Sequence, residues 1–160
     1  MMDVTLSCSF TGHRIIPHAH LAPLTEKLRE VVAIAYRNGT RDFYTGGAMG
    51  FDRLAASIVL EMKQNHPDVR LHLVLPCEGQ EEKWSPDEQE AYRKERAAAD
   101  TVEVLSPYYY EGCMKVRNQA LIDRADMCVA YVTNPRSGAG QTLRMAQKYN
   151  VSCVNLADLI

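Results

Sequence analysis

Short segments with the two-residue period of a β-strand alternate along this chain with longer segments of helical period. Apolar and polar residues alternate between positions 4 and 10, for example, and apolar residues recur at helical spacing between positions 24 and 35. Such alternation is typical of a parallel sheet with helices on both faces, so we predict an α/β fold with a mostly parallel sheet. The predicted strands cover residues 4–10, 42–45, 71–75, 101–105, 127–132 and 152–156, and the predicted helices cover residues 24–35, 51–62, 85–99, 114–124 and 140–149.

The length and composition of the chain narrow its class. At 160 residues it is long enough to bury a full core, and we expect residues 1–160 to form one domain. The net charge of -2 gives no general attraction to nucleic acid, which is therefore not an expected partner. Five cysteines without a C-x-x-C pair indicate a reducing, cytoplasmic setting. Residues 1–10 lack the pattern of a signal peptide, and no segment is apolar enough to span a bilayer, so we expect no membrane partner.

The loops that follow the predicted strands carry most of the unusual residues of the chain. In a parallel sheet all of these loops emerge at one edge, and ligands bind in the crevice outside that edge. The glycines, basic residues and aromatic residues of the loops should therefore surround a common site. The loops cover residues 11–14, 45–52, 76–84, 107–118 and 134–142.

Two of these loops are rich in glycine and lead into helices. Backbone N–H groups at the N-terminus of a helix bind anions, so each loop could hold a phosphate. The alternative for the first loop is a tight turn that needs glycine, and for the second it is a serine cap with glycines for clearance. Neither loop has the spacing of the dinucleotide-binding fingerprint or of a P-loop. The candidate residues are Gly46, Gly47 and Gly50 in the first loop and Ser137, Gly138 and Thr142 in the second.

Charged side chains in the loops suit an anionic ligand. Arg14 can bind a phosphate bidentately, and His13 could donate a hydrogen bond to it or act as an acid or base. Arg117 opposes the dipole at the start of its helix, a placement that a bound anion would offset. We expect truncation of Arg117 to weaken ligand binding with little effect on stability. Asp52 could cap its helix or accept hydrogen bonds from a ribose.

Aromatic, histidine and acidic residues in the loops could serve a ligand or simply be structural. Trp84 and the tyrosines at residues 108–110 could stack on a base, although such residues also pack against strand ends. His18 and His20 lie in a predicted loop with no third ligand spaced for zinc, so we expect no metal. The acidic residues near Glu78 could do acid–base chemistry, but a solvated surface is the more ordinary interpretation.

The loop motifs together resemble one family. They are Thr-Gly-His-Arg at 11–14, Gly-Gly-Ala-Met-Gly-Phe-Asp at 46–52, Leu-Pro-Cys at 75–77, Gly-Cys-Met at 112–114 followed by Arg117 and Asn118, and the Ser-Gly-rich loop from 137. In this order they resemble the YpsA-like branch of the SLOG superfamily, named for the Smf/DprA and LOG proteins. The resemblance covers essentially the whole chain. It implies a Rossmann-like three-layer sandwich that binds a nucleotide or a nucleotide-derived ligand such as ADP-ribose, without a further cofactor.

The resemblance also implies a role and a set of contacts. YpsA-like proteins are associated with bacterial cell division and stress, and superfamily relatives often form homodimers, which is analogy only. DprA-type relatives bind single-stranded DNA, a function that needs a basic surface. The expected ligand-binding residues are Gly12, His13, Arg14, Gly46, Gly47, Gly50, Asp52, Arg117, Asn118, Ser137, Gly138 and Thr142.

One departure from the family bears on enzyme activity. LOG-type phosphoribohydrolases carry a P-G-G-x-G-T-x-x-E motif with a catalytic glutamate. Alignment on Gly140 places Arg144 at that position, and a cation cannot stabilise an oxocarbenium-like centre. The leading hypothesis is therefore a ligand-binding protein. The alternative is an N-glycosidase acting on nucleoside monophosphates through Asp52 or Glu78, and a third hypothesis is an interaction module whose pocket has lost its ligand.

Overall fold

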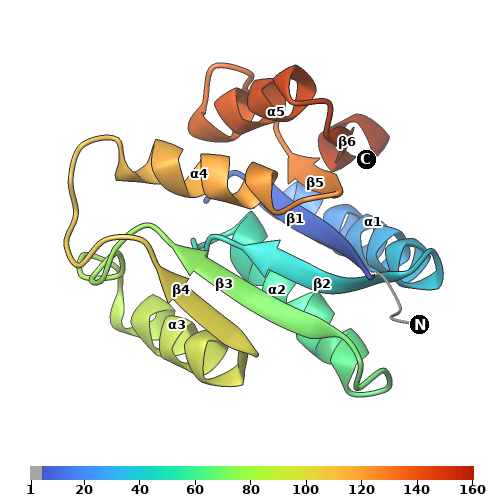
Figure 1. Ribbon diagram of the computed structural model, residues 1–160, viewed down its shortest axis with the longest axis horizontal. Coiled ribbons are helices and arrows are strands. Elements are labelled where there is room, and N and C mark those ends of the chain that lie inside the picture. The colour runs from blue at the N-terminus through green and yellow to red at the C-terminus, as the bar shows by residue number, and fades with distance from the viewer. Residues whose placement is uncertain (1–4) are drawn as a thin grey trace.

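The central element of the fold is β1 (Leu6–Gly12), which lies in the middle of a parallel sheet (Figure 1). The computed structural model describes residues 5–160, so Val4, the first residue of the predicted strand, lies outside the described residues. Within that range the sheet has six strands in the order β4-β3-β2-β1-β5-β6, and every neighbouring pair is parallel. The other strands are β2 (Thr40–Thr45), β3 (Arg70–Leu75), β4 (Thr101–Val104), β5 (Met127–Tyr131) and β6 (Ser152–Asn155).

Helices cover both faces of the sheet, which confirms the predicted three-layer α/β sandwich. One layer contains α1 (His18–Arg37), α2 (Phe51–Lys63) and α3 (Pro86–Ala98), and the other contains α4 (Cys113–Asp123) and α5 (Gly138–Lys148) (Figure 1). A 3₁₀ turn, η1 (Leu156–Leu159), follows β6. No helix within residues 5–160 is long and apolar enough to cross a membrane.

The central strand is buried on both faces. Phe10 packs against Phe43 of β2, with ring centroids 6.1 Å apart, in the core beneath α1 and α2. Ser9 points the other way, where its hydroxyl donates to the carbonyl of Leu121 in α4 at 2.6 Å. The alternation of apolar and polar residues in β1 therefore does not separate core from solvent, because a buried hydroxyl can be satisfied by a neighbouring helix.

Several predicted boundaries shift by a residue or two, for example at the end of β1, the start of β2 and the start of α5, and two further differences change how named residues are placed. The first helix begins at His18 rather than near residue 24, so His18 and His20 lie on α1 and not in a loop. Pro23 lies inside α1 without ending it, although a proline there has no N–H to donate to the carbonyl one turn earlier. The last strand ends at Asn155, whose side chain accepts a hydrogen bond from Ala157 N at 3.2 Å and so caps η1.

The start of α3 follows the sequence closely. Ser85 caps the helix by accepting a hydrogen bond from Glu88 N at 3.3 Å, and Pro86 occupies the first helical position as predicted. The Glu88 carboxylate does not complete a capping box, because it pairs instead with Arg53 of α2. The first turn of α3 is thereby tied to α2.

Candidate functional site

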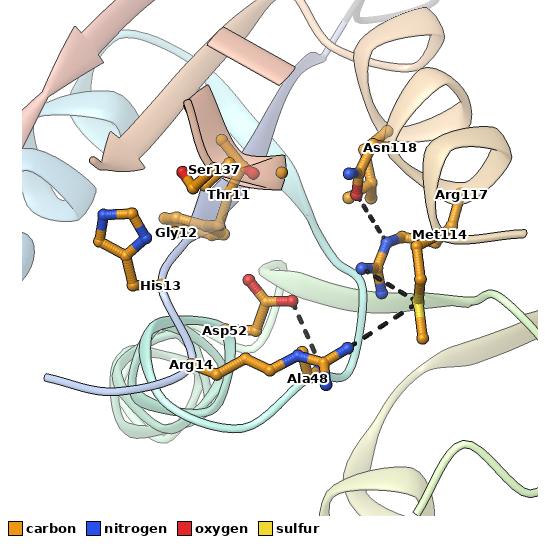
Figure 2. A pocket seen from close by; sticks show the side chains of 14 residues that line it. Thr11, Gly12, His13, Arg14, Ala48, Asp52, Met114, Arg117, Asn118 and Ser137 are labelled. Atoms are coloured by element: carbon orange, nitrogen blue, oxygen red, sulfur yellow. Dashed lines mark hydrogen bonds between the residues drawn. The ribbon is translucent and has the colours of Figure 1, made fainter. Parts of the chain in front are cut away.

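A cavity of about 360 Å³ lies at the carboxyl end of β1. Connections on the β2 side of β1 pass over one face of the sheet and those on the β5 side pass over the other, so β1 marks the switch point at which α/β proteins bind ligands. The cavity walls are the loop after β1, the start of α2, the inner side of α4 and the first turn of α5 (Figure 2).

The cavity brings together most of the residues predicted from the sequence. Those that line it are Gly12, His13, Arg14, Asp52, Arg117, Asn118, Ser137 and Gly138. Four predicted residues do not line it, namely Gly46, Gly47, Gly50 and Thr142. The three glycines make close packing contacts, and Thr142 is buried within α5.

The glycines after β2 make close backbone approaches. A Cβ on Gly46 would lie 2.4 Å from Nη1 of Arg117, and one on Gly47 would lie 2.5 Å from the side chain of Leu75. Gly50 has φ of 73°, and a Cβ there would lie 2.2 Å from the carbonyl oxygen of Arg14. These contacts account for the glycines by clearance and backbone conformation, and this placement does not support the predicted phosphate cradle.

The N-terminus of α5 presents free donors to the cavity. Ser137 caps the helix, since its Oγ accepts from Gly140 N at 3.0 Å and donates to the Asn134 carbonyl at 2.7 Å. The N–H groups of Gly138 and Ala139 have no hydrogen-bond partner in the described part of the chain, and both residues line the cavity. Thr142 is buried and donates to the Gly138 carbonyl inside the helix, so its hydroxyl is not available to a ligand.

Arg117 is buried at the cavity wall, with only 7% of its surface exposed. Its Nη1 donates to the Gly46 carbonyl at 2.9 Å, and its Nε donates to Oδ1 of Asn118 at 2.8 Å. Burial lowers the pKa of Arg117, but a guanidinium stays protonated at neutral pH. Such burial makes Arg117 part of the packing, so the expectation that its truncation would hardly change stability does not follow from the structure.

Two guanidinium groups approach the same methionine. Arg14, which is exposed, and Arg117 place Nη2 atoms 3.9 Å and 3.8 Å from the sulfur of Met114 (Figure 2). Neither arginine has a carboxylate within 4.0 Å among residues 5–160. The only carboxylate among the lining residues is that of Asp52, so the side chains of the cavity carry a net positive charge.

Asp52 points into the cavity from the first turn of α2 (Figure 2). It is 5% exposed, and its Oδ2 accepts a hydrogen bond from Ala48 N at 3.3 Å. Burial raises the pKa of Asp52, and the charges of Arg117 and Arg14 together with the Ala48 N–H partly offset that rise. A carboxylate in this position can accept hydrogen bonds from a hydroxyl group or take up a proton.

The ring of His13 is held by backbone donors. Its Nε2 accepts from the N–H of Thr133 at 2.8 Å and from the N–H of Asn134 at 3.3 Å. Because Nε2 accepts these bonds, the neutral ring carries its hydrogen on Nδ1. Burial lowers the pKa of His13, which favours the same neutral form. His13 therefore offers a ligand one N–H donor rather than a positive charge.

Several lining residues were not predicted. They are Phe10, Thr11, Ala48, Met114, Leu121 and Ala139. Thr11, Ala48, Met114 and Ala139 adjoin predicted residues in the same motifs, so position in the motif was the available signal. Nothing in the sequence marks Phe10 or Leu121, because an apolar residue in a strand or helix has the same pattern whether it faces the core or a cavity.

Other candidate residues lie outside the cavity. Arg144 is exposed and hydrogen-bonds to the carbonyl of Pro135. Glu78 pairs with Arg96 of α3 at 3.3 Å. Within residues 5–160, no three histidine, cysteine, aspartate or glutamate side chains gather in a way that could hold a metal ion.

The sequence matches a known family over most of its length. A family model for YpsA, described as the YspA SLOG family, matches residues 17–158. The chain belongs to this family. It has the Rossmann-like fold of the SLOG proteins, a fold related to nucleotide binding.

Individual bacterial relatives are similar at modest identity. A UPF0398 protein of Shouchella clausii is 34% identical over 104 residues, which are 63% of this chain and 55% of that protein. The prophage-derived protein YoqJ of Bacillus subtilis, described as uncharacterized, is 32% identical over 139 residues, covering 78% of this chain and 81% of that one. A UPF0398 protein of Halalkalibacterium halodurans is 25% identical over 171 residues, and the match covers 99% of this chain and 90% of that protein. This chain thus spans about half of the Shouchella protein but most of the other two.

Solved structures share the fold at lower identity. DNA processing protein A from Helicobacter pylori superposes with a TM-score of 0.64 at 20% identity, covering 92% of this chain and 63% of that one. The target TM1055 gives a TM-score of 0.60 at 15% identity, covering 93% and 72%. The Helicobacter structure describes a single-stranded DNA binding mode of that protein, so the likeness lends no support to the expectation that nucleic acid is not a partner here. At these identities the likeness shows the fold alone.

Proposed function

We propose that this protein is a cytoplasmic regulatory protein that binds a nucleotide-derived ligand in the cavity at the end of β1. ADP-ribose represents the proposed class of ligand. The observation that carries the proposal is the meeting of Arg14, Arg117 and the free N–H groups of α5 on one cavity. Two cations and a helix N-terminus favour an anionic group, and phosphate accepts hydrogen bonds from all three.

The proposed contacts are of two kinds: hydrogen-bond donors for the phosphate and a carboxylate acceptor for the ribose. The phosphate would accept hydrogen bonds from Gly138 N, Ala139 N and Arg14, with the buried charge of Arg117 behind it. Asp52 would accept a hydrogen bond from a ribose hydroxyl, because its carboxylate faces the cavity. The charges of Arg117 and Arg14 favour the ionised form of Asp52, which is the stronger acceptor. The Nδ1–H group of His13 is a further donor at the same wall.

Arg14 is the residue with which to test the proposal, because it is exposed and so contributes little to the core. ADP-ribose and AMP should raise the melting temperature of the native protein. A ligand at about one hundred times its Kd stabilises a protein by roughly 2.7 kcal/mol, or about 5–10 °C for a domain of this size. Arg14→Ala should weaken binding about 10-fold or more, since a hydrogen bond to a charged group is worth roughly 1.5–3 kcal/mol.

Arg136→Ala is the matched control. Arg136 is also exposed and precedes α5, but it does not line the cavity, so its removal changes the net charge equally without removing a contact. The affinity of Arg136→Ala for ADP-ribose and AMP should stay within about twofold of that of the native protein, measured by isothermal titration calorimetry in the same buffer. An equal loss of affinity in both variants would show that net charge, and not a contact with Arg14, is responsible. A native protein that binds no nucleotide would refute the proposal.

A second function is favoured by the burial of Asp52 alone. A buried carboxylate with a raised pKa in a cavity is a candidate acid or base, and N-glycosidic cleavage of a nucleoside monophosphate would use it. Glu78 is a poor alternative because it pairs with Arg96 away from the cavity. Chromatography of AMP incubated with the protein should then detect free adenine, and Asp52→Asn should abolish its release. Intact AMP after incubation with the native protein would exclude this function.

The cellular role that the resemblance implies is also a proposal. A regulatory part in bacterial cell division or stress requires that ligand binding, and not merely the presence of the protein, affects the cell. A strain carrying Arg14→Ala at normal protein level should then show the phenotype of the deletion strain. A wild-type phenotype in that strain would separate the cellular role from this cavity.

A further inference from the structure

A second cavity, of about 550 Å³, adjoins the first. The two cavities share Arg14 and Met114 as lining residues, so these side chains form the boundary between them. The second cavity extends over the loop between β3 and α3, and its far wall contains Trp84 and Tyr109. Both volumes fall within the range of small-molecule sites, roughly 300–1,000 Å³.

The chemistry of the second cavity differs from that of the first. Trp84 is half-buried, and its ring meets that of Tyr92 edge-on with centroids 5.2 Å apart. The guanidinium carbon of Arg53 lies 5.7 Å from the centroid of the Trp84 ring. Contacts with Tyr92 and Arg53 therefore hold the indole in place. The side chains of Met49 and Met114 add polarizable sulfur, which makes favourable contacts with aromatic rings. The second cavity therefore suits a flat aromatic group.

A shared carbonyl fixes the two cavities relative to each other. The Gly46 carbonyl accepts a hydrogen bond from Arg117 at the first cavity at 2.9 Å and one from Gln80 at the second at 3.3 Å. Gln80 also donates to the hydroxyl of Tyr92 at 3.0 Å, and Tyr92 supports Trp84. The anion-binding wall and the aromatic wall are thus parts of one hydrogen-bonded unit, and the distance between them is set by the fold.

We propose that one ligand spans both cavities, with its phosphate in the first and a heteroaromatic base against Trp84 and Tyr109 in the second. This inference rests on the proposed function, because it takes the first cavity as the phosphate site. It adds that the protein distinguishes a nucleotide from a sugar phosphate by stacking. Arg14 lies at the boundary, where it can contact the phosphate and flank the base. Stacking tolerates different bases, so recognition at this end is for an aromatic ring and not for one base.

The chain provides its own reporter for this test, because Trp84 is its single tryptophan. AMP and ribose 5-phosphate form a matched pair of probes that differ only by the base. AMP should quench the emission of Trp84, whereas ribose 5-phosphate should bind without quenching and should bind at least about 5-fold more weakly, the lower end of what base stacking contributes. Calorimetry on the same samples measures both affinities.

Two neighbouring tyrosines provide the variant and its control. Tyr108 and Tyr109 are both 67% exposed, but only Tyr109 lines the cavity. Tyr109→Ala should weaken AMP about 5-fold and leave ribose 5-phosphate unchanged, and Tyr108→Ala should change neither. Equal affinities for the two probes with unchanged Trp84 emission would overturn the spanning ligand while leaving the phosphate site intact. Failure of both probes to bind would overturn the proposed function as well.

Discussion

Replacing Arg117 by methionine should lower stability as well as ligand affinity. Arg117 is 7% exposed and donates hydrogen bonds to the Gly46 carbonyl and to Asn118 at 2.9 Å and 2.8 Å. A lost hydrogen bond from a charged donor costs about 1.5–3 kcal/mol, and methionine keeps most of the apolar stem, so we expect a loss of about 3–5 kcal/mol. That loss is a large share of the roughly 5–15 kcal/mol by which a domain is stable.

Urea unfolding followed by Trp84 emission measures this loss as a lower midpoint at unchanged slope. Lys115→Met is the control, because Lys115 is exposed on the same helix and should change stability by no more than about 0.5 kcal/mol. A loss in Arg117→Met as small as that of the control would refute the inference that buried hydrogen bonds hold the guanidinium. Combining Arg117→Met with Asp52→Asn should cost less than the two changes added, since Arg117 offsets the buried charge of Asp52.

Two further predictions concern the loops and the helix behind the cavities. Gly50→Ala should destabilise the protein by at least about 1 kcal/mol more than Gly112→Ala in the same urea assay, because both have positive φ but only at Gly50 would the new Cβ meet backbone, 2.2 Å from the Arg14 carbonyl. Equal losses would show that the loops move apart easily. Burial raises the pKa of Glu95 from 4.5 to about 8. The contribution of Glu95 to the free energy of unfolding should therefore be greatest below pH 4.5 and should fall, by at most about 5 kcal/mol, as the pH rises through 8. Glu95→Gln should flatten that part of the stability profile, and an unchanged slope between pH 5 and 8 would contradict the shift.

The fold could be predicted from the sequence because its pattern is repeated. Each strand of the parallel sheet is followed by a helix, so the order and type of the elements could be predicted, whereas their boundaries shift by a residue or two in several places and by more at the start of α1. The position of the site followed from the same topology, since the carboxyl ends of parallel strands meet at one edge. His13 follows β1, Asp52 lies in the first turn of α2 and Arg117 lies on α4, and the structure brings all three to one cavity.

The roles of the glycines could not be predicted in the same way. A glycine that receives a phosphate and a glycine that receives a neighbouring side chain look alike in sequence, because both are selected for the missing Cβ. Only the three-dimensional neighbours distinguish them: Gly46 meets Arg117 and Gly50 meets the backbone of Arg14, whereas Gly138 has open space at its Cβ position. The direction of Arg117 is a similar case, since helical spacing does not say whether a cation faces water or the sheet.

The buried charges near the cavity work against the stability of the fold. Burial shifts the pKa of Asp52 and Glu95 upward and that of Arg117 downward, and each shift measures an ionised form that the fold disfavours. Replacing one of two oppositely charged buried groups costs stability, whereas replacing both together with well-packed apolar residues is often without loss. Asp52 and Arg117 line the first cavity, and Glu95 lies close enough for the Asp52 charge to affect its pKa. The proposed anionic ligand beside Arg14 and Arg117 would offset the excess positive charge of the lining side chains.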